Sequence, residues 1–242
     1  MPTSATCCEP PVRPKRAEMA GAEAAGSRVG WDPAPEQGWV APHVAAEFPG
    51  LGIAWIEVDG RPGKSPDPVR RRLRDLSDRF FGAHAIHMRE RPIPWAYRVF
   101  FRQIGLDPDR TRTPVEQLAL DRLYYGAFTS QGLPTDALTI AIVETGVALR
   151  AFDAEGLEGR LCIRDSAPGE SLAGRPGELA QGTLAIADDH APVGLLFGAS
   201  AEGRGVGRDT RRVAIVAVQV KGVPQIAVDE ALWMVAATLE SA

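Results

Sequence analysis

The sequence predicts an α+β protein in which layered helices pack on a β-sandwich-like mixed sheet. Helical periodicity dominates residues 67–145, whereas residues 148–220 form short apolar runs separated by Gly, Asp or Pro. A run of helices followed by a run of strands is typical of α+β folds and differs from an alternating βαβ repeat. The chain has 242 residues, 45% of them hydrophobic, which suffices for a domain with a full core.

The N-terminal segment is expected to be a flexible tail. Residues 1–46 are rich in Ala, Gly, Pro and Glu, and prolines interrupt every candidate period. One segment around Trp39 is expected to dock loosely on the core. We therefore place a tail over residues 1–46 and a single domain over residues 47–242.

Helices are predicted by apolar residues spaced three or four apart. The clearest start is the capping box Thr113-Pro114-Val115-Glu116, which has Pro at the first helical position. The predicted helices cover residues 67–80, 94–104, 113–125, 135–143 and 227–239.

Strands are predicted by short apolar runs bounded by turn residues. The first precedes the helices and is closed by Asp59-Gly60, whereas the others follow the helical region. The predicted strands cover residues 51–58, 148–152, 160–164, 184–187, 193–197 and 212–220.

Composition excludes several classes of protein. The net charge of −4 excludes a simple histone-like nucleic-acid binder but leaves room for a local basic patch. No apolar run reaches the roughly 18–20 residues of a membrane span, so we expect no membrane partner. Three cysteines cannot build a disulfide framework, and no secretory signal is recognisable. The expected location is the cytoplasm.

The charges are unevenly distributed along the chain. Residues 61–125 hold 14 Arg and Lys against 8 Asp and Glu, whereas residues 126–203 hold 4 against 11. Arginine pairs well with phosphate, so the basic half is a candidate RNA-binding face. Solvated helix faces would produce the same pattern. The candidate RNA-binding residues are Arg70, Arg71, Arg74, Arg98 and Arg102.

Other motifs carry little chemistry. The pair His84 and His87 has helical spacing but no third ligand by sequence, so we expect no metal. The glycine-rich stretch 198–207 lacks Gly-Lys-Ser/Thr and precedes a strand, so a flexible loop is expected instead of a nucleotide site. Cys162 alternates within a strand and is expected in the core. No cofactor is expected.

Several short segments occur in the order of a known family. The segments are VALRAFD at 147–153, LCIR at 161–164, APGE at 167–170, LAIAD at 184–188, LLFG at 195–198 and Asp209-Thr210. Together they resemble the tRNA-binding and editing domain of the phenylalanyl-tRNA synthetase beta subunit, its third and fourth modules, in a free-standing form. The segments 100–106 and 112–116 resemble the opening helices of that domain.

The resemblance implies an α+β editing domain that binds tRNA or aminoacyl-tRNA and hydrolyses mischarged aminoacyl-tRNA in trans. It does not imply a complete ligase, because nothing here resembles the class II catalytic domain that carries the ligase motifs. Ester hydrolysis needs a positioned water, donors for the oxyanion and recognition of the amine. No metal is required for this chemistry.

The resemblance also implies the site residues. Arg150 stands where the synthetase has His, and Glu202 is the nearest match to the Glu of its Gly-Gly-Glu loop, taken as two residues longer here. We expect Arg150 and Glu202 to be the catalytic pair. The family's Val-Asp-x-x-Asn corresponds to a segment that keeps Asp136 and has Thr139 for Asn. The expected substrate-binding residues are Asp136, Thr139, Asp153, Asp188, Gly198, Gly205 and Thr210.

Two alternatives of other classes remain open at this point. The domain could be a non-catalytic RNA-binding module, or a binder of an amino acid or similar small molecule on the same fold. We expect no DNA partner, and the sequence leaves the oligomeric state open.

Overall fold

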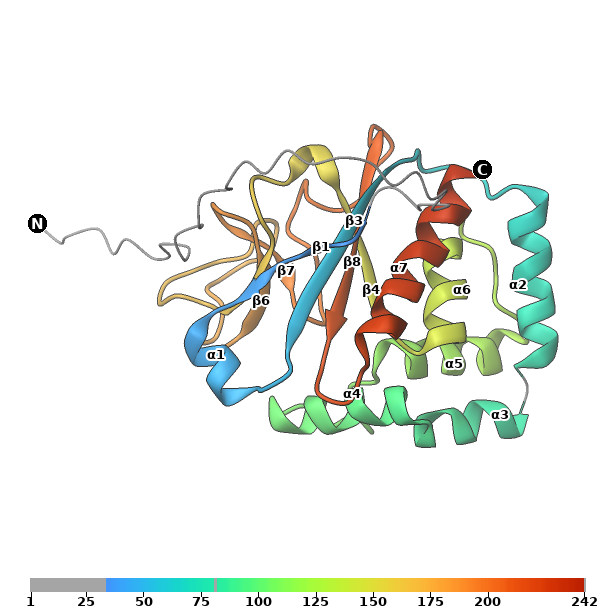
Figure 1. Cartoon of the computed structure of the whole chain (residues 1–242), viewed down its shortest axis with the longest axis horizontal. Helices are drawn as coiled ribbons and strands as arrows, with labels where there is room; N and C mark the ends of the chain where they lie inside the picture. The colour runs from blue at the N-terminus through green and yellow to red at the C-terminus, as the bar shows by residue number, and fades with distance from the viewer. Residues whose placement is uncertain (1–33, 81, 242) are drawn as a thin grey trace, which may run out of the picture. The chain divides into compact units, whose positions relative to one another are not determined.

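The computed structural model describes residues 34–80 and 82–241, which form helices packed around two four-stranded sheets. The predicted α+β class is confirmed. In Figure 1 the first sheet lies in the middle, with helices on one side and the second sheet on the other.

The first sheet is antiparallel throughout, in the order β1-β3-β8-β4. Its strands are β1 (Glu36–Gln37), β3 (Gly52–Asp59), β8 (Arg212–Gln219) and β4 (Ala148–Asp153). In the central strand, residues 213–218 are entirely buried. A continuous apolar run is what a strand covered on both faces requires.

The second sheet is mixed, in the order β2-β5-β6-β7. Strand β2 runs parallel to β5, and the other pairs are antiparallel. Its strands are β2 (Trp39–Val40), β5 (Cys162–Asp165), β6 (Leu184–Ala187) and β7 (Pro192–Leu195). Cys162 is buried, as predicted.

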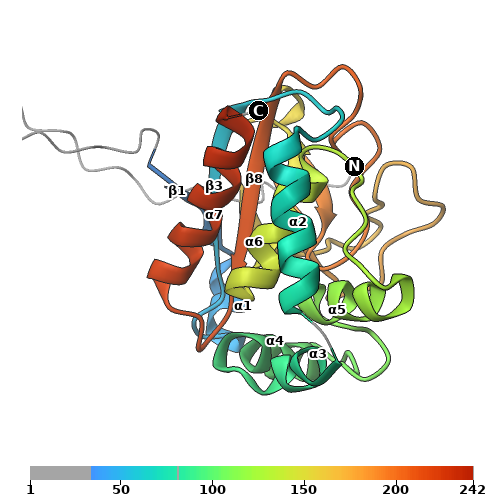
Figure 2. The same cartoon turned by 90° about the vertical axis from the view of Figure 1, so that its right-hand side faces the viewer.

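The helices cover the face of the first sheet that the second sheet leaves open. Figure 1 and Figure 2 show α7 and α6 lying against it, with α2 packed on the outer side of α6 and α3, α4 and α5 at one end. The helices are α1 (Pro42–Glu47), α2 (Asp67–Arg79), α3 (Gly82–His87), α4 (Pro92–Gln103), α5 (Pro114–Tyr125), α6 (Thr135–Thr145) and α7 (Gln225–Glu240). Short 3-10 turns occur at Met88–Glu90 and Ala154–Gly156. None of the helices among the described residues is long and apolar enough to cross a membrane.

The predicted capping box at the start of α5 is confirmed. The backbone N–H of Thr113 and its Oγ1 both donate to Oε2 of Glu116, at 3.3 and 2.8 Å. Helix α4 is fixed to the first sheet by Tyr97, whose Oη donates to the Val218 carbonyl (2.5 Å) and accepts the Ala148 N–H (3.0 Å). This contact sets the distance between α4 and the sheet.

The ordered region begins ahead of the predicted boundary at residue 47. Strands β1 and β2 pair with β3 and β5, and α1 buries Val44 in the core. Between these two strands, the Gly38 N–H donates to the Ile53 carbonyl (2.9 Å), and a Cβ on Gly38 would lie 2.4 Å from Cγ2 of Ile53. Part of the predicted tail therefore contributes an edge strand to each sheet. The rest of that tail, residues 1–33, lies outside the described residues.

Candidate functional site

Arg150 projects from β4 into the space between the two sheets. Its Nη1 donates to the Leu195 carbonyl, and its Nη2 donates to Ser200 Oγ at 3.0 Å. The guanidinium carbon lies 5.0 Å from the centre of the Phe152 ring, within cation–π range. No carboxylate among the described residues forms an ion pair with Arg150.

Burial lowers the pKa of Arg150 to about 10. The guanidinium is still protonated at pH 7, because this value lies well above neutrality. A partly buried cation without a carboxylate partner is less well compensated than one in water or in an ion pair, although the Leu195 carbonyl and Ser200 accept hydrogen bonds from it. Such a group is a strong candidate for binding a ligand anion or a polarised carbonyl.

A pocket of about 270 Å³ opens beside Arg150. Aromatic and aliphatic side chains form most of its wall, and Arg112 and Gln117 add polar groups at the start of α5. Within the described chain, its lining includes no Asp, Glu or His. The lining residues are Phe101, Arg112, Pro114, Gln117, Ala148, Leu149, Arg150, Leu196, Phe197, Gly198 and Val218. The pocket is apolar and positively charged, and its volume suits a group of amino-acid size.

The turn that forms one wall of this pocket depends on Gly198. A Cβ at this position would lie 2.9 Å from Cβ of Leu195, which is too close for any side chain. The Gly198 N–H donates to the Leu195 carbonyl at 3.3 Å and closes the turn. The expected contribution of Gly198 to the site is therefore to the shape of the pocket wall.

The structure separates the expected pair of Arg150 and Glu202. Glu202 is exposed, does not line the pocket, and its backbone N–H donates to the Ala173 carbonyl at 2.9 Å. The position facing Arg150 belongs to Ser200 instead. Sequence reasoning missed Ser200, because the pairing of this serine with Arg150 depends on how the turn at 195–200 folds back on β4.

The Asp188 carboxylate is held by hydrogen bonds within the fold. Its Oδ1 accepts the N–H groups of His190 and Ala191, both at 2.9 Å, and its Oδ2 accepts the Glu158 N–H (3.2 Å) and Arg204 (3.0 Å). Burial disfavours the charged carboxylate, but these donors outweigh burial and hold the pKa of Asp188 below its ordinary value. The turn around His190 is thus held by Asp188, whose oxygens are already occupied.

Asp153 and Thr210 fasten the glycine-rich loop to β4. Thr210 Oγ1 donates to Oδ2 of Asp153 at 2.6 Å and accepts the Gly207 N–H at 3.0 Å. Gly205 forms a backbone bridge with Phe152, next to Asp153 on the strand. These predicted substrate-binding residues lie outside the pocket lining.

Asp136 and Thr139 lie on α6, away from the pocket lining. The Asp136 side chain is only 1% exposed and accepts Ser65 Oγ (2.6 Å), Ser130 Oγ (2.5 Å) and the Gln131 N–H (2.7 Å). It therefore joins the loop before α2 to the loop before α6. Thr139 is partly buried on the same helix.

Arg98 does not form part of an exposed RNA-binding face. It is 4% exposed, and its guanidinium donates to Oε1 of Glu116 (2.5 Å) and Oδ1 of Asp109 (2.7 Å). By contrast, Arg102 is exposed on the same helix and stacks over Trp95, with 5.6 Å between its guanidinium carbon and the ring centre. The prediction for Arg98 is wrong because its side chain points into the helix bundle.

The arginines of α2 divide into two kinds. Arg70 forms an ion pair with Asp67 on the same helix. Arg71 and Arg74 are exposed, and neither forms an ion pair with another described residue. These two side chains remain accessible for a phosphate.

No group of three or more metal-ligating side chains occurs in the part of the chain that the structure describes. Of the histidine pair, His87 contacts Glu90 at 3.3 Å, and the side chain of His84 lies outside the described atoms. Scanned against protein-family models, the chain matches none, and a search of curated proteins also finds no match. The resemblance to the synthetase editing domain stays a prediction from the sequence motifs.

Proposed function

We propose that the chain binds the aminoacyl end of a tRNA in the Arg150 pocket and hydrolyses mischarged aminoacyl-tRNA in trans. The observation that carries this proposal is the partly buried cation of Arg150, which has no carboxylate partner among the described residues and lies at the wall of an amino-acid-sized apolar pocket. Two segments of the resemblance, VALRAFD and LLFG, supply Arg150 and Gly198 to that pocket. The chain is not a complete ligase in this proposal.

Arg150 has the chemistry of an electrostatic stabiliser. Negative charge develops on the ester carbonyl oxygen during hydrolysis, and a fixed guanidinium in an apolar site stabilises it more than water would. Ser200 and the Leu195 carbonyl fix the guanidinium, so it needs little reorganisation. In this proposal the amino-acid side chain packs against the aromatic wall formed by Phe101 and Phe197.

Gln117 is the candidate for positioning the attacking water. Its Nε2 donates to Asp121 at 2.9 Å, which leaves its Oε1 as an acceptor beside the pocket. An amide oxygen orients a water but does not remove its proton at neutral pH. The proposed hydrolysis therefore relies on charge stabilisation by Arg150 more than on a protein base.

Several arginines supply candidate contacts for the RNA backbone. Arg102 follows the pocket residue Phe101 and lies over the exposed Trp95, an arrangement suited to a phosphate beside a stacked base. Arg112 lines the pocket itself. Arg71 and Arg74 on α2 are further candidates.

The test is ester cleavage with a panel of mischarged tRNAs. Arg150→Gln should lower the cleavage rate on the order of 100-fold, the scale for losing a positioned oxyanion donor. Glu202→Gln is the matched control and should cleave like the wild type, because Glu202 lies outside the pocket. Equal cleavage by Arg150→Gln would remove Arg150 from the mechanism. Binding without cleavage across the panel would favour the non-catalytic RNA-binding module.

The absence of acidic residues from the described pocket lining favours a second candidate, a small-molecule binder. A free amino acid would place its ammonium group in a pocket that offers no carboxylate, whereas an N-acyl amino acid has a neutral amide in its place and keeps the carboxylate for Arg150. Heat stabilisation by N-acetylphenylalanine, lost in Arg150→Gln and without tRNA affinity, would support this candidate.

A further inference from the structure

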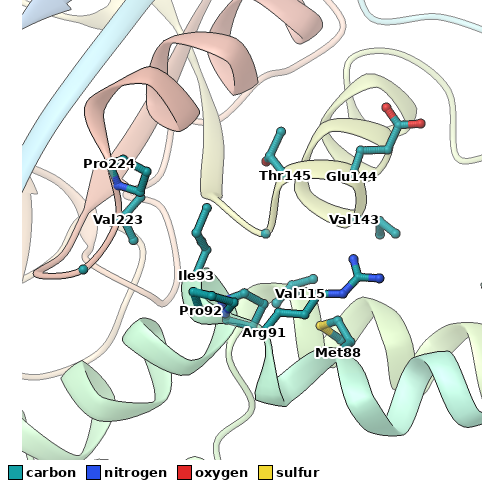
Figure 3. Close-up of a pocket in the computed structure, with 13 residues that line it drawn as sticks. Met88, Arg91, Pro92, Ile93, Val115, Val143, Glu144, Thr145, Val223 and Pro224 are labelled. Carbon is teal, nitrogen blue, oxygen red and sulfur yellow. The ribbon is translucent and has the colours of Figure 1, made fainter.

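A second cavity, of about 690 Å³, lies where the N-terminal ends of α4 and α7 meet the C-terminal end of α6 (Figure 3). It shares no lining residue with the Arg150 pocket. Its wall is formed mainly by aliphatic side chains, three prolines and two glycines. The lining residues are Met88, Arg91, Pro92, Ile93, Pro94, Val115, Val143, Glu144, Thr145, Gly146, Gly222, Val223 and Pro224. A volume of this size lies within the range of small-molecule sites.

Most polar groups that line this cavity already have partners within the protein. Thr145 Oγ1 donates to the Ala141 carbonyl (2.7 Å) and accepts the Val147 N–H (3.1 Å), so its hydrogen bonds are already made. The Glu144 carboxylate is held by two arginines of α2. A neutral polar ligand, such as a sugar, would find few free partners here.

Arg91 differs from these groups. Its guanidinium projects across the cavity toward Val143, as Figure 3 shows, and it forms no ion pair with any described residue. A neighbouring cavity of about 440 Å³ shares Arg91, Val143 and Glu144 with this one and adds Arg79. Arg72 and Arg79 both contact Glu144, at 2.6 and 3.2 Å, so its charge is already compensated and Arg91 keeps no carboxylate partner among the described residues.

We propose that this cavity binds an amphipathic monocarboxylate, with its aliphatic or aromatic body on the apolar wall and its carboxylate on Arg91. Charge complementarity selects an anion, because the arginines exceed the acidic partner. The wall selects an apolar body, since aliphatic and proline side chains offer it dispersion contacts and few competing hydrogen bonds. The site is independent of the proposed tRNA function.

Decanoate is the probe, and methyl NMR of the full chain labelled at methionine Cε is the assay. Met88 lines the cavity, whereas Met234 lies ten residues along α7 from Pro224 and does not line it. Decanoate should shift the Met88 signal in a saturable manner and leave Met234 unchanged. Decanol and acetate, which lack the carboxylate and the apolar body respectively, should each bind at least about tenfold more weakly.

Arg91→Gln should weaken decanoate binding by about tenfold or more, the scale of a lost hydrogen bond to a charged group. Its control is Arg211→Gln, which also removes an exposed charge and lies outside this cavity. The Arg91 side chain forms no hydrogen bond or ion pair with another described residue, and an unchanged Met234 signal will show that the variant folds. Failure of decanoate to shift Met88, equal binding by decanol, or unaltered affinity in Arg91→Gln would overturn the proposal.

Discussion

Replacing Arg98 by Met should destabilise the fold and leave the exposed arginines proposed to contact RNA unchanged. The guanidinium is 4% exposed and contacts Glu116, which is itself buried and caps α5. Without Arg98, the Glu116 carboxylate stays buried with no cation, a change that costs about 3–5 kcal/mol. In a domain of this size each kcal/mol shifts Tm by roughly 2–4 °C, so the Tm should fall by about 6–20 °C.

Thermal unfolding followed by circular dichroism measures this shift. Arg102→Met is the control on the same helix, and its free energy of unfolding should stay within about 0.5 kcal/mol of the wild type. The double variant Arg98→Met/Glu116→Gln should recover part of the loss, because Gln removes the stranded charge and still fits a capping box. A Tm within about 2 °C of the wild type for Arg98→Met would refute the buried ion pair.

Three further perturbations test the packing. Gly38→Ala should cost about 1–3 kcal/mol in urea unfolding, because its Cβ would collide with Ile53. Tyr97→Phe should cost about 1–3 kcal/mol in the same assay, since it leaves buried backbone groups without its hydroxyl. The hydrogen bond from Arg164 holds the pKa of Glu170 below its ordinary value, against the opposing effect of burial. The ionised Glu170 therefore stabilises the fold above the unfolded pKa, and this stabilisation is lost as pH falls through the folded pKa. In Glu170→Gln, the free energy of unfolding should fall less steeply below about pH 5, by at most about 1.4 kcal/mol per pH unit.

Elements with strong local signals could be predicted from the sequence. Helix α5 begins at its capping box, and β8 is a continuous apolar run. Strands β1 and β2 could not be predicted, because each has two residues and exists only through pairing with β3 and β5. No periodicity can appear in so short a segment.

The candidate site could be predicted only in part from the sequence. The sequence motifs singled out Arg150 and Gly198. The structure places both residues in the lining of one pocket. The partner of Arg150 depends on the turn at 195–200, whose register the sequence alone did not reveal. Arg98 was misassigned by counting charges, although its position beside Tyr97 on the apolar face of α4 indicated burial.

The pairing of β3 with β8 has a consequence for synthesis of the chain. Gly52 pairs with Gln219, about 170 positions later. At about 5–20 residues per second, a ribosome completes β8 roughly 8–35 s after β3. During this interval the apolar strand that carries Trp55 and Ile56 has no central partner, and an unpaired strand invites association with other chains. The helices between β3 and β8 in the sequence need only local contacts and can form before β8 is synthesised. The yield of native protein should therefore depend on translation speed between residues 59 and 219, and on whatever shields β3 until β8 emerges.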